Sequence, residues 1–273
     1  MGGYKNMKII KESVRENSNA FMQGYIRNAD AESGHFKYPA VIIVPGGSYT
    51  HIPINQAESF ALTYSAQGYQ SFFLRYTFES EATPLLPNPL IELANTIKMI
   101  KENAVEWNID EDKIVIAGFS IGGHIVSLFN DLYDSTWFRD IAKIDDASQI
   151  KPAATILGYP VINLKLGFPN DEEKIANWID NDIEMAADEH VTQTNVPTFI
   201  WATTDDPVVP SMNAIKYAEK LNENSVDNEL HLFHHGPHGL ALANDLTAWN
   251  DASNDSHVAK WFQLSNEWLK EIL

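Results

Sequence analysis

The chain has 273 residues, of which 44% are hydrophobic and 11% aromatic, so it can bury a large core. Chains of this length commonly form one α/β domain, and we expect a single domain over residues 1–273. Its 19 basic and 37 acidic residues give a formal charge of -18, which repels phosphate backbones and anionic lipid surfaces. The charge therefore argues against nucleic acid and membranes as partners.

The chain contains no cysteine, which excludes disulfides, thiolate metal sites and a cysteine nucleophile. No apolar run approaches the length of a membrane span, and the N-terminus lacks the apolar core of a signal peptide. We therefore expect a cytoplasmic protein. The sequence leaves self-association into a homo-oligomer open.

The first expected elements are strands at the edge and centre of a sheet. Residues 7–11 and 20–27 are short mixed runs separated by polar residues, which is typical of a hairpin at a sheet edge. Residues 40–44 form a continuous apolar run, as in a strand that is covered on both faces. Helical spacing over 54–67 and a further strand over 69–76 follow.

The middle of the chain continues the alternation of predicted strands and helices. An acidic, proline-rich loop is expected between residues 78 and 89. Apolar residues at helical spacing then predict a helix over 90–107, and an apolar run from residue 113 predicts the next strand. Strands that alternate with helices are typical of βαβ units. We therefore expect a mostly parallel central sheet with helices on both faces.

The second half carries the remaining expected elements: strands over 153–160, 198–203 and 230–233, a helix over 211–221 and an amphipathic helix over 258–273. Residues 161–195 interrupt this series, because they are acidic, with scattered aromatic residues and no clear strand. Two interpretations stay open for this segment. It is either a lid or small insertion over a site, or a solvated excursion on the surface.

A serine between glycines is the strongest chemical signal. An apolar run leads into Gly118-Phe119-Ser120-Ile121-Gly122, and a segment compatible with a helix follows at once. In such a turn the serine is held in a strained conformation that lifts its hydroxyl above the sheet, and the glycines let the chain pass tightly. The new helix also directs free N–H groups toward the turn. Ser120 is therefore a candidate nucleophile.

Serine needs a base and a third group that orients the base. Asp205 and Asp206 follow one predicted strand, and a group of histidines that includes His238 follows the next. Each lies at the carboxyl end of a predicted parallel strand, where ligands bind open α/β sheets. We favour Asp206, because it immediately precedes Pro207 in a run that anchors the loop, but an exposed turn aspartate is the alternative.

Several histidines lie close together in the sequence, and they could serve either as metal ligands or as the catalytic base. They lack the spacing of helical metal ligands, so we expect neither a metal nor another cofactor. His238 stands in a loop between Pro237 and Gly239 and is the favoured base. His124 begins a helical turn just after Ser120, and we expect it to be a packed, hydrogen-bonded residue.

These motifs resemble the α/β-hydrolase superfamily and, more narrowly, its acetyl-xylan esterase or carbohydrate-esterase-like branch. The resemblance extends from about residue 38 to the C-terminus. Ser48 and Ile121 stand where this branch carries glycine and alanine. The motifs that carry the resemblance are residues 45–49, 73–76, 118–124, 204–210 and 235–239.

The resemblance implies roles for individual residues. Ser120 would be the nucleophile, His238 the base and Asp206 the acid. Gly47, Ser48 and Ile121 would form the oxyanion hole with backbone N–H groups, and the branched Ile121 would narrow the acyl pocket.

The resemblance also implies an activity, namely hydrolysis of short-chain esters, above all acetyl esters, of a small molecule such as a carbohydrate. The alternatives are a serine amidase or peptidase-like hydrolase, including a formamidase, and a catalytically silent binding protein. The natural acyl and alcohol groups stay open.

Overall fold

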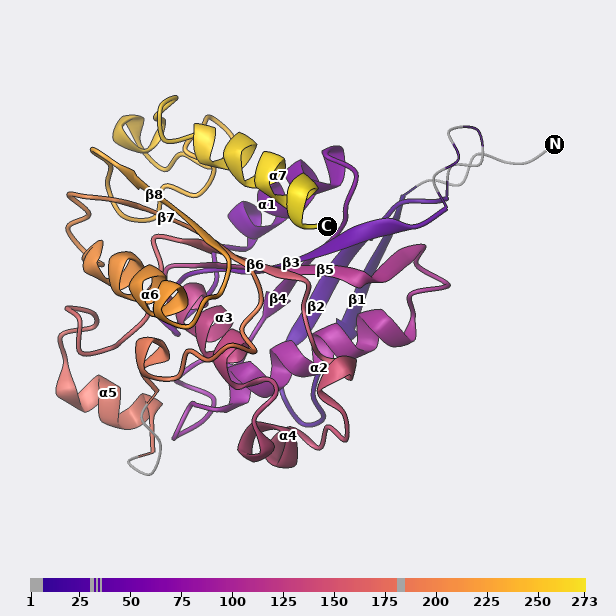
Figure 1. Cartoon of the computed structure of the whole chain (residues 1–273), viewed down its shortest axis with the longest axis horizontal. Helices are drawn as coiled ribbons and strands as arrows, with labels where there is room; N and C mark the ends of the chain where they lie inside the picture. Colours follow the sequence, from indigo (N-terminus) through magenta and orange to yellow (C-terminus); the bar gives the residue numbers. More distant parts are fainter. Residues whose placement is uncertain (1–6, 30–31, 33, 35, 181–184) are drawn as a thin grey trace.

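A computed structural model describes residues 7–29, 32, 34, 36–180 and 185–273. Its centre is a sheet of eight strands in the order β1-β2-β4-β3-β5-β6-β7-β8 (Figure 1). The strands are β1 (Lys8–Ser13), β2 (Phe21–Ile26), β3 (Tyr38–Val44), β4 (Gln70–Arg75), β5 (Ile109–Phe119), β6 (Ala154–Gly158), β7 (Thr198–Thr203) and β8 (Asn228–Phe233).

The sheet is antiparallel at one edge and parallel elsewhere. Strand β1 pairs antiparallel with β2, and β2 pairs antiparallel with β4, so the predicted hairpin lies at the edge. From β4 to β8 every pairing is parallel, with Val41 beside Val115 at the centre. The predicted α/β-hydrolase architecture with a mostly parallel sheet is confirmed.

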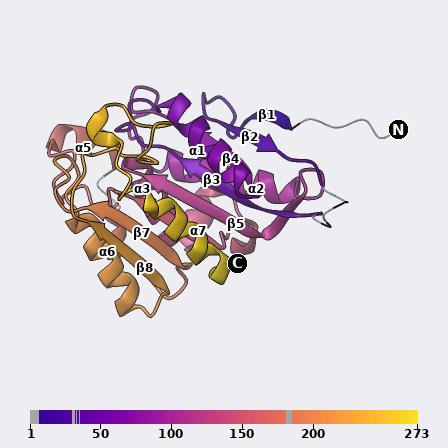
Figure 2. The same cartoon turned by 90° about the horizontal axis from the view of Figure 1, so that it is seen from above.

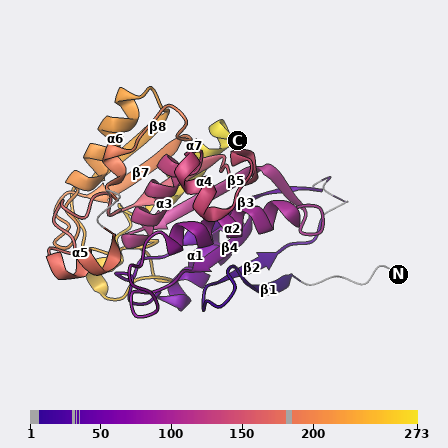
Figure 3. The same ribbon diagram turned by 90° about the horizontal axis from the view of Figure 1, so that it is seen from below.

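Helices cover both faces of the sheet, as the alternating pattern predicts. Helices α1 (Ile54–Ala66) and α7 (Lys260–Ile272) lie on one face (Figure 2). Helices α2 (Asn88–Glu102), α3 (Ile121–Leu132) and α6 (Met212–Glu223) lie on the other (Figure 3). This double cover explains why the central strands read as continuous apolar runs: residues 40–44 of β3 are completely buried.

The structure differs from the sequence-based expectation in three helices. Helix α2 ends at Glu102 instead of continuing to residue 107, because the chain turns at Asn103, whose side-chain amide donates to the carbonyl of Met99. Helices α4 (Thr136–Ala142) and α5 (Glu172–Trp178) were not predicted. Each has only seven residues and is fixed at its start by a side-chain cap, Ser135 for α4 and Asp171 for α5.

Short 3-10 helices complete the described elements: η1 (Ala147–Gln149), η2 (Ala187–Glu189) and η3 (Asp251–Ser253). No described helix has both the length and the apolar character that crossing a membrane requires.

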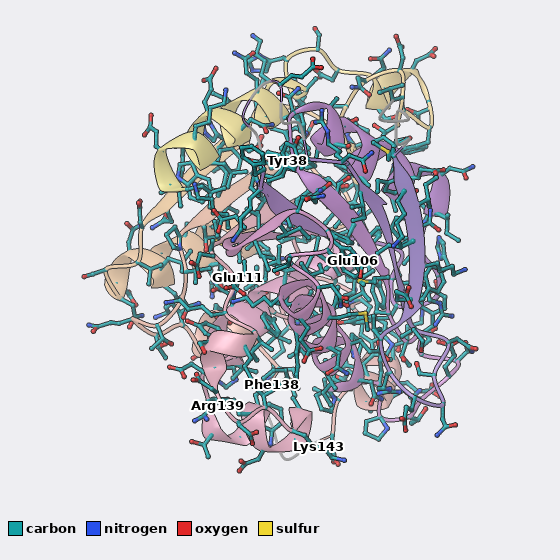
Figure 4. The ribbon with its side chains drawn as sticks, turned by 90° about the vertical axis from the view of Figure 1, so that its right-hand side faces the viewer. Tyr38, Glu106, Glu111, Phe138, Arg139 and Lys143 are labelled. Atoms are coloured by element: carbon teal, nitrogen blue, oxygen red, sulfur yellow. The ribbon has the colours of Figure 1, made fainter. Side chains whose placement is uncertain are left out.

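The parallel strands begin at one end of the molecule and finish at the other. Figure 4 looks onto the end where they begin, and shows Tyr38 at the start of β3 and Glu111 near the start of β5. The loops that follow β3, β5, β7 and β8 therefore lie at the opposite end. In open α/β sheets this is the end where ligands bind.

Candidate active site

Ser120 occupies a sharp turn between β5 and α3. Its φ is 55°, in the left-handed region that a residue with a side chain rarely adopts. Three backbone hydrogen bonds hold it there: its N–H donates to the carbonyl of Gly158 (3.0 Å), and its own carbonyl accepts from Gly123 (2.9 Å) and Val161 (3.0 Å). The neighbouring strand β6 and the new helix thus fix the strained conformation together, which is how such strain persists at functional sites.

The turn can form only because two neighbours lack side chains. A Cβ on Gly118 would lie 2.4 Å from the carbonyl oxygen of Gly122. A Cβ on Gly122 would lie 2.1 Å from the carbonyl oxygen of Val44, at the end of β3. The glycine spacing in the sequence therefore reflects close backbone contact among β3, β5 and α3.

Ser120, His238 and Asp206 form one chain of hydrogen bonds. Ser120 Oγ lies 2.7 Å from His238 Nε2, and His238 Nδ1 lies 2.7 Å from Asp206 Oδ2. Because a carboxylate only accepts hydrogen bonds, Nδ1 carries the proton and Nε2 is free to accept from the serine hydroxyl. The side chains of His238 and Asp206 are 16% and 1% exposed. The structure thus brings together three groups that the sequence separates by up to 118 residues.

The two neighbouring aspartates have different environments. The Oδ1 atom of Asp206 accepts hydrogen bonds from the backbone N–H groups of Val208 (2.8 Å) and Val209 (3.0 Å). These bonds fix the carboxylate in the position from which Oδ2 contacts His238. Asp205 pairs with His235 instead, at 2.9 Å, and both of these side chains are exposed. The run that begins at Pro207 therefore anchors Asp206 through its backbone, as the sequence pattern suggests.

Tyr159 is a neighbour of the imidazole that sequence reasoning missed. Its ring stands edge-on to His238, with 5.1 Å between ring centroids, and its hydroxyl accepts the N–H of Ala241 at 3.2 Å. Burial raises the pKa of Tyr159, so this ring stays neutral. Tyr159 therefore packs against the ring of His238 and ties the loop after His238 to the end of β6.

The loop after β3 passes directly beside the serine. A Cβ on Gly46 would lie 3.0 Å from Ser120 Cβ, and one on Gly47, whose φ is 125°, would lie 1.9 Å from the carbonyl oxygen of His51. Ile121 is the first residue of α3, where N–H groups lack a partner within the helix. The loop after β3 and the first turn of α3 thus both lie next to Ser120, and the oxyanion hole of Gly47, Ser48 and Ile121 stays a prediction.

Gly47→Ala is expected to reduce the ester hydrolysis that the sequence motifs imply by about 100-fold or more, because the new Cβ displaces the loop that borders Ser120. Gly68→Ala is the matched control: Gly68 also has a positive φ, of 99°, but a Cβ there would meet nothing within 4 Å. We expect the control to lose stability through backbone strain and to keep its activity. Steady-state kinetics and thermal melts of both variants check this, and a fully active Gly47→Ala would contradict it.

His124 is a buried residue with two partners, as expected from the sequence. Its Nδ1 accepts from the Tyr49 hydroxyl (2.8 Å), and its Nε2 donates to the carbonyl of Met185 (2.8 Å). Burial lowers the pKa of His124 to about 4, although the bond to Met185 opposes the shift. His124 is therefore neutral at pH 7 and joins the loop after β3 to the segment that precedes β7.

His124 makes stability dependent on pH. The unfolded chain protonates this histidine below the ordinary pKa of 6.5, whereas the folded chain resists protonation down to about 4. Stability is therefore lost as the pH falls across that window. Relative to His124→Gln, whose amide can still donate to Met185, the wild type should lose about 3 kcal/mol more between pH 7 and pH 4. Urea unfolding of both proteins measures this, and parallel pH profiles would contradict it.

The described part of residues 161–195 packs against the loops that follow β3 and β4. Trp178, the last residue of α5, lies edge-on to Tyr49 with 5.0 Å between ring centroids, and its indole N–H donates to Glu79 at 2.6 Å. The N–H of Leu86 donates to the carbonyl of Trp178 at 2.8 Å. The segment is thus bound to the loop after β4 and to Tyr49. Its role as a lid stays a prediction.

Among the described residues, no group of three or more histidine, aspartate or glutamate side chains is arranged to hold a metal ion. The histidines around His235 form pairs instead. His231 contacts Glu229 at 2.5 Å, and His235 contacts Asp205.

A serine at a strand-to-helix elbow of a mostly parallel sheet, with an aspartate and a histidine after later strands, defines the α/β-hydrolase class. The chain belongs to the BD-FAE family, whose model matches residues 29–221. The resemblance that the sequence motifs indicate, to the esterase branch of the α/β-hydrolases, is confirmed.

Two relatives are larger than this chain. Endo-1,4-beta-xylanase B of Butyrivibrio fibrisolvens is 31% identical over 81% of this chain and 34% of its own length. The acetylxylan esterase of Xylanibacter ruminicola is 24% identical over 74% of this chain and 41% of its own length. The matched region thus spans less than half of each relative.

Several solved structures match along almost their whole length. One of them is the carboxylesterase Cest-2923 from Lactobacillus plantarum WCFS1, with a TM-score of 0.90 and 30% identity over 98% of both chains. The fold of this chain therefore extends over the same length as that of a structurally known esterase.

Proposed function

We propose that this protein is a carboxylic ester hydrolase that cleaves short acyl esters, above all acetyl esters, by way of an acyl-enzyme on Ser120. The observation that carries the proposal is the continuous hydrogen-bonded chain from Ser120 through His238 to Asp206, with 2.7 Å at each contact. A serine hydroxyl becomes a useful nucleophile only with such a base and orienting group.

In the first half-reaction, His238 Nε2 takes the proton of Ser120 while Oγ attacks the ester carbonyl. The backbone N–H groups of Ile121 and of the turn at Gly47 and Ser48 stabilise the negative charge on the carbonyl oxygen. The intermediate then collapses, the bond to the alcohol oxygen breaks, and His238 gives its proton to the leaving alcohol. Ser120 now carries the acyl group.

In the second half-reaction, water repeats the attack on the acyl-enzyme. His238 takes one proton from the water, the same N–H groups stabilise the oxyanion, and Ser120 leaves with the proton that His238 returns. Asp206 accepts the Nδ1–H bond throughout and stabilises the imidazolium that forms in each half. The products are the free acid and the regenerated enzyme.

The crowding around Ser120 supports a short acyl group. The side chain of Ile121 is completely buried, Gly46 approaches Ser120 closely enough that a Cβ would lie 3.0 Å from Ser120 Cβ, and Ser120 itself is only 7% exposed. The name of one relative, an acetylxylan esterase, points to acetyl groups on a carbohydrate, and we extend that substrate class to this chain as part of the proposal.

A panel of p-nitrophenyl esters tests the proposal. We expect kcat/KM to fall at least about tenfold from the acetate to the octanoate, because a longer chain must displace packed side chains. p-Nitroacetanilide, the amide of the same acyl group, serves as the comparison and should react far more slowly than the acetate. Turnover of the anilide with no turnover of esters would indicate an amidase instead. Failure of a fluorophosphonate probe to label Ser120 would indicate a silent protein.

A further inference from the structure

A surface groove of about 530 Å³ lies between the start of α1 and the loop before α7. We call it the Trp249 groove. It is lined by Ile52, Pro53, Ile54, Asn55, Gln56, Ser59, Leu246, Thr247, Ala248 and Trp249. None of these ten residues carries a charge, although the chain as a whole has a formal charge of -18. The groove is therefore suited to a neutral ligand.

Both walls of the Trp249 groove continue from loops that border Ser120. One wall starts at Ile52, directly after His51, whose carbonyl oxygen would lie 1.9 Å from a Cβ on Gly47. In the other wall, Trp249 Nε1 would lie 4.0 Å from a Cβ on Gly239, the residue after His238. The groove thus lies on the side of the site where the base is.

This position assigns the groove to the alcohol part of the ester. The base must return its proton to the oxygen of the leaving alcohol, so the alcohol leaves past His238. Trp249 lies close to this exit, because its Nε1 would be 4.0 Å from a Cβ on Gly239, the residue after His238. An alcohol large enough to extend from the site therefore contacts the Trp249 groove.

The lining of the groove combines exposed apolar side chains with amide side chains. Trp249, Leu246 and Ile54 are 61%, 67% and 49% exposed. Asn55 and Gln56, which follow Ile54 in α1, add amide groups. A flat apolar face next to hydrogen-bonding groups matches a pyranose ring, whose C–H groups form its faces and whose hydroxyls surround its edge.

The groove is held in shape without a ligand. The backbone N–H of Trp249 donates to Ser253 Oγ at 2.9 Å, and Asn250 and Ser253 form a capping box. Across the groove, the side-chain amide of Gln56 donates to the carbonyl of Thr247 at 3.3 Å. The indole is thus presented to solvent on a fixed backbone, which reduces the entropy lost on binding.

We propose that the Trp249 groove binds a neutral pyranose ring in the alcohol part of the substrate, with the ring stacked on the indole of Trp249. This inference rests on the proposed function, because it defines the substrate class of the same site. Trp249 acts in it as a specificity-determining residue and takes no part in the chemical steps.

Kinetics with two acetates of different alcohols test the inference. The measured quantity is the ratio of kcat/KM for glucose pentaacetate to kcat/KM for ethyl acetate. We expect Trp249→Ala to lower this ratio about tenfold, mainly through KM, because stacking on the indole is lost. Trp249→Phe should restore most of the ratio. A ratio within about twofold of the wild type in Trp249→Ala would overturn the inference.

Phe36→Ala is the matched control, because Phe36 is also 61% exposed and lies two residues before Tyr38, at the opposite end of the sheet (Figure 4). It should leave both rates unchanged. A thermal melt of each variant checks that it is folded.

A second measurement does not depend on turnover. Saturation-transfer NMR with methyl β-D-glucopyranoside should detect binding to the wild type and to Phe36→Ala, and lose it in Trp249→Ala. Binding of benzyl alcohol without binding of the pyranoside would overturn the inference. If the wild type hydrolyses neither acetate, the proposed function fails, and the NMR result alone decides whether the groove binds the sugar.

Discussion

Ser120→Ala is expected to lower ester hydrolysis by roughly 10⁶-fold, the size of loss found when the nucleophile of a comparable triad is removed. The reason is that the variant lacks the hydroxyl whose Oγ lies 2.7 Å from His238 Nε2. Initial rates with p-nitrophenyl acetate measure the loss, and circular dichroism with thermal melting confirms that the variant is folded. Turnover close to that of the wild type would eliminate Ser120 as the nucleophile.

Ser120→Gly is the informative companion to this variant. It removes the same hydroxyl and also relieves the strain of a side chain at a φ of 55°. We expect it to be inactive but more stable than Ser120→Ala, by about 1 kcal/mol in the free energy of unfolding. Equal stability of the two variants would mean that the turn stores no strain.

Asp206→Asn is expected to lower kcat by about 10⁴-fold at neutral pH. The new amide would keep its oxygen toward the N–H groups of Val208 and Val209 and turn its NH₂ toward His238 Nδ1. That arrangement forces the imidazole proton onto Nε2, where the ring can no longer accept the proton of Ser120. Steady-state kinetics with p-nitrophenyl acetate measure the effect.

Asp205→Asn provides a control of the same chemistry one residue away. Asp205 pairs with His235 at 2.9 Å much as Asp206 pairs with His238, but both members of the outer pair are exposed. Exposed pairs contribute little, so we expect Asp205→Asn to retain activity within about threefold of the wild type. A larger loss in Asp205→Asn than in Asp206→Asn would exchange the roles of the two carboxylates.

The central part of the fold was predictable from the sequence, because a strand that is buried on both faces appears as a continuous apolar run. Residues 40–44 and 198–203 read as largely apolar runs, and all of these residues are buried in the structure. The turn at Ser120 was predictable because backbone contact, such as that of Gly122 with Val44, tolerates only glycine. In both cases the physical constraint acts on a few consecutive residues.

Other features depend on contacts between segments that are distant in the sequence, and no local sequence pattern reveals them. The bond between Tyr49 and His124 joins residues 75 positions apart, and neither residue has a neighbour pattern that reveals it. Helix α5 is too short for a periodic signal, and it is bound to Tyr49 through Trp178. Trp249 likewise reads as one exposed aromatic residue until the fold places it beside Gly239.

The elbow at Ser120 is fixed by backbone atoms of β3, β5 and β6, which side-chain replacement elsewhere can scarcely alter. Selection for a new ester therefore has to act on the rim, on loops such as the one that carries Trp249. Directed evolution of this chain would then change the preferred alcohol and keep the reaction itself.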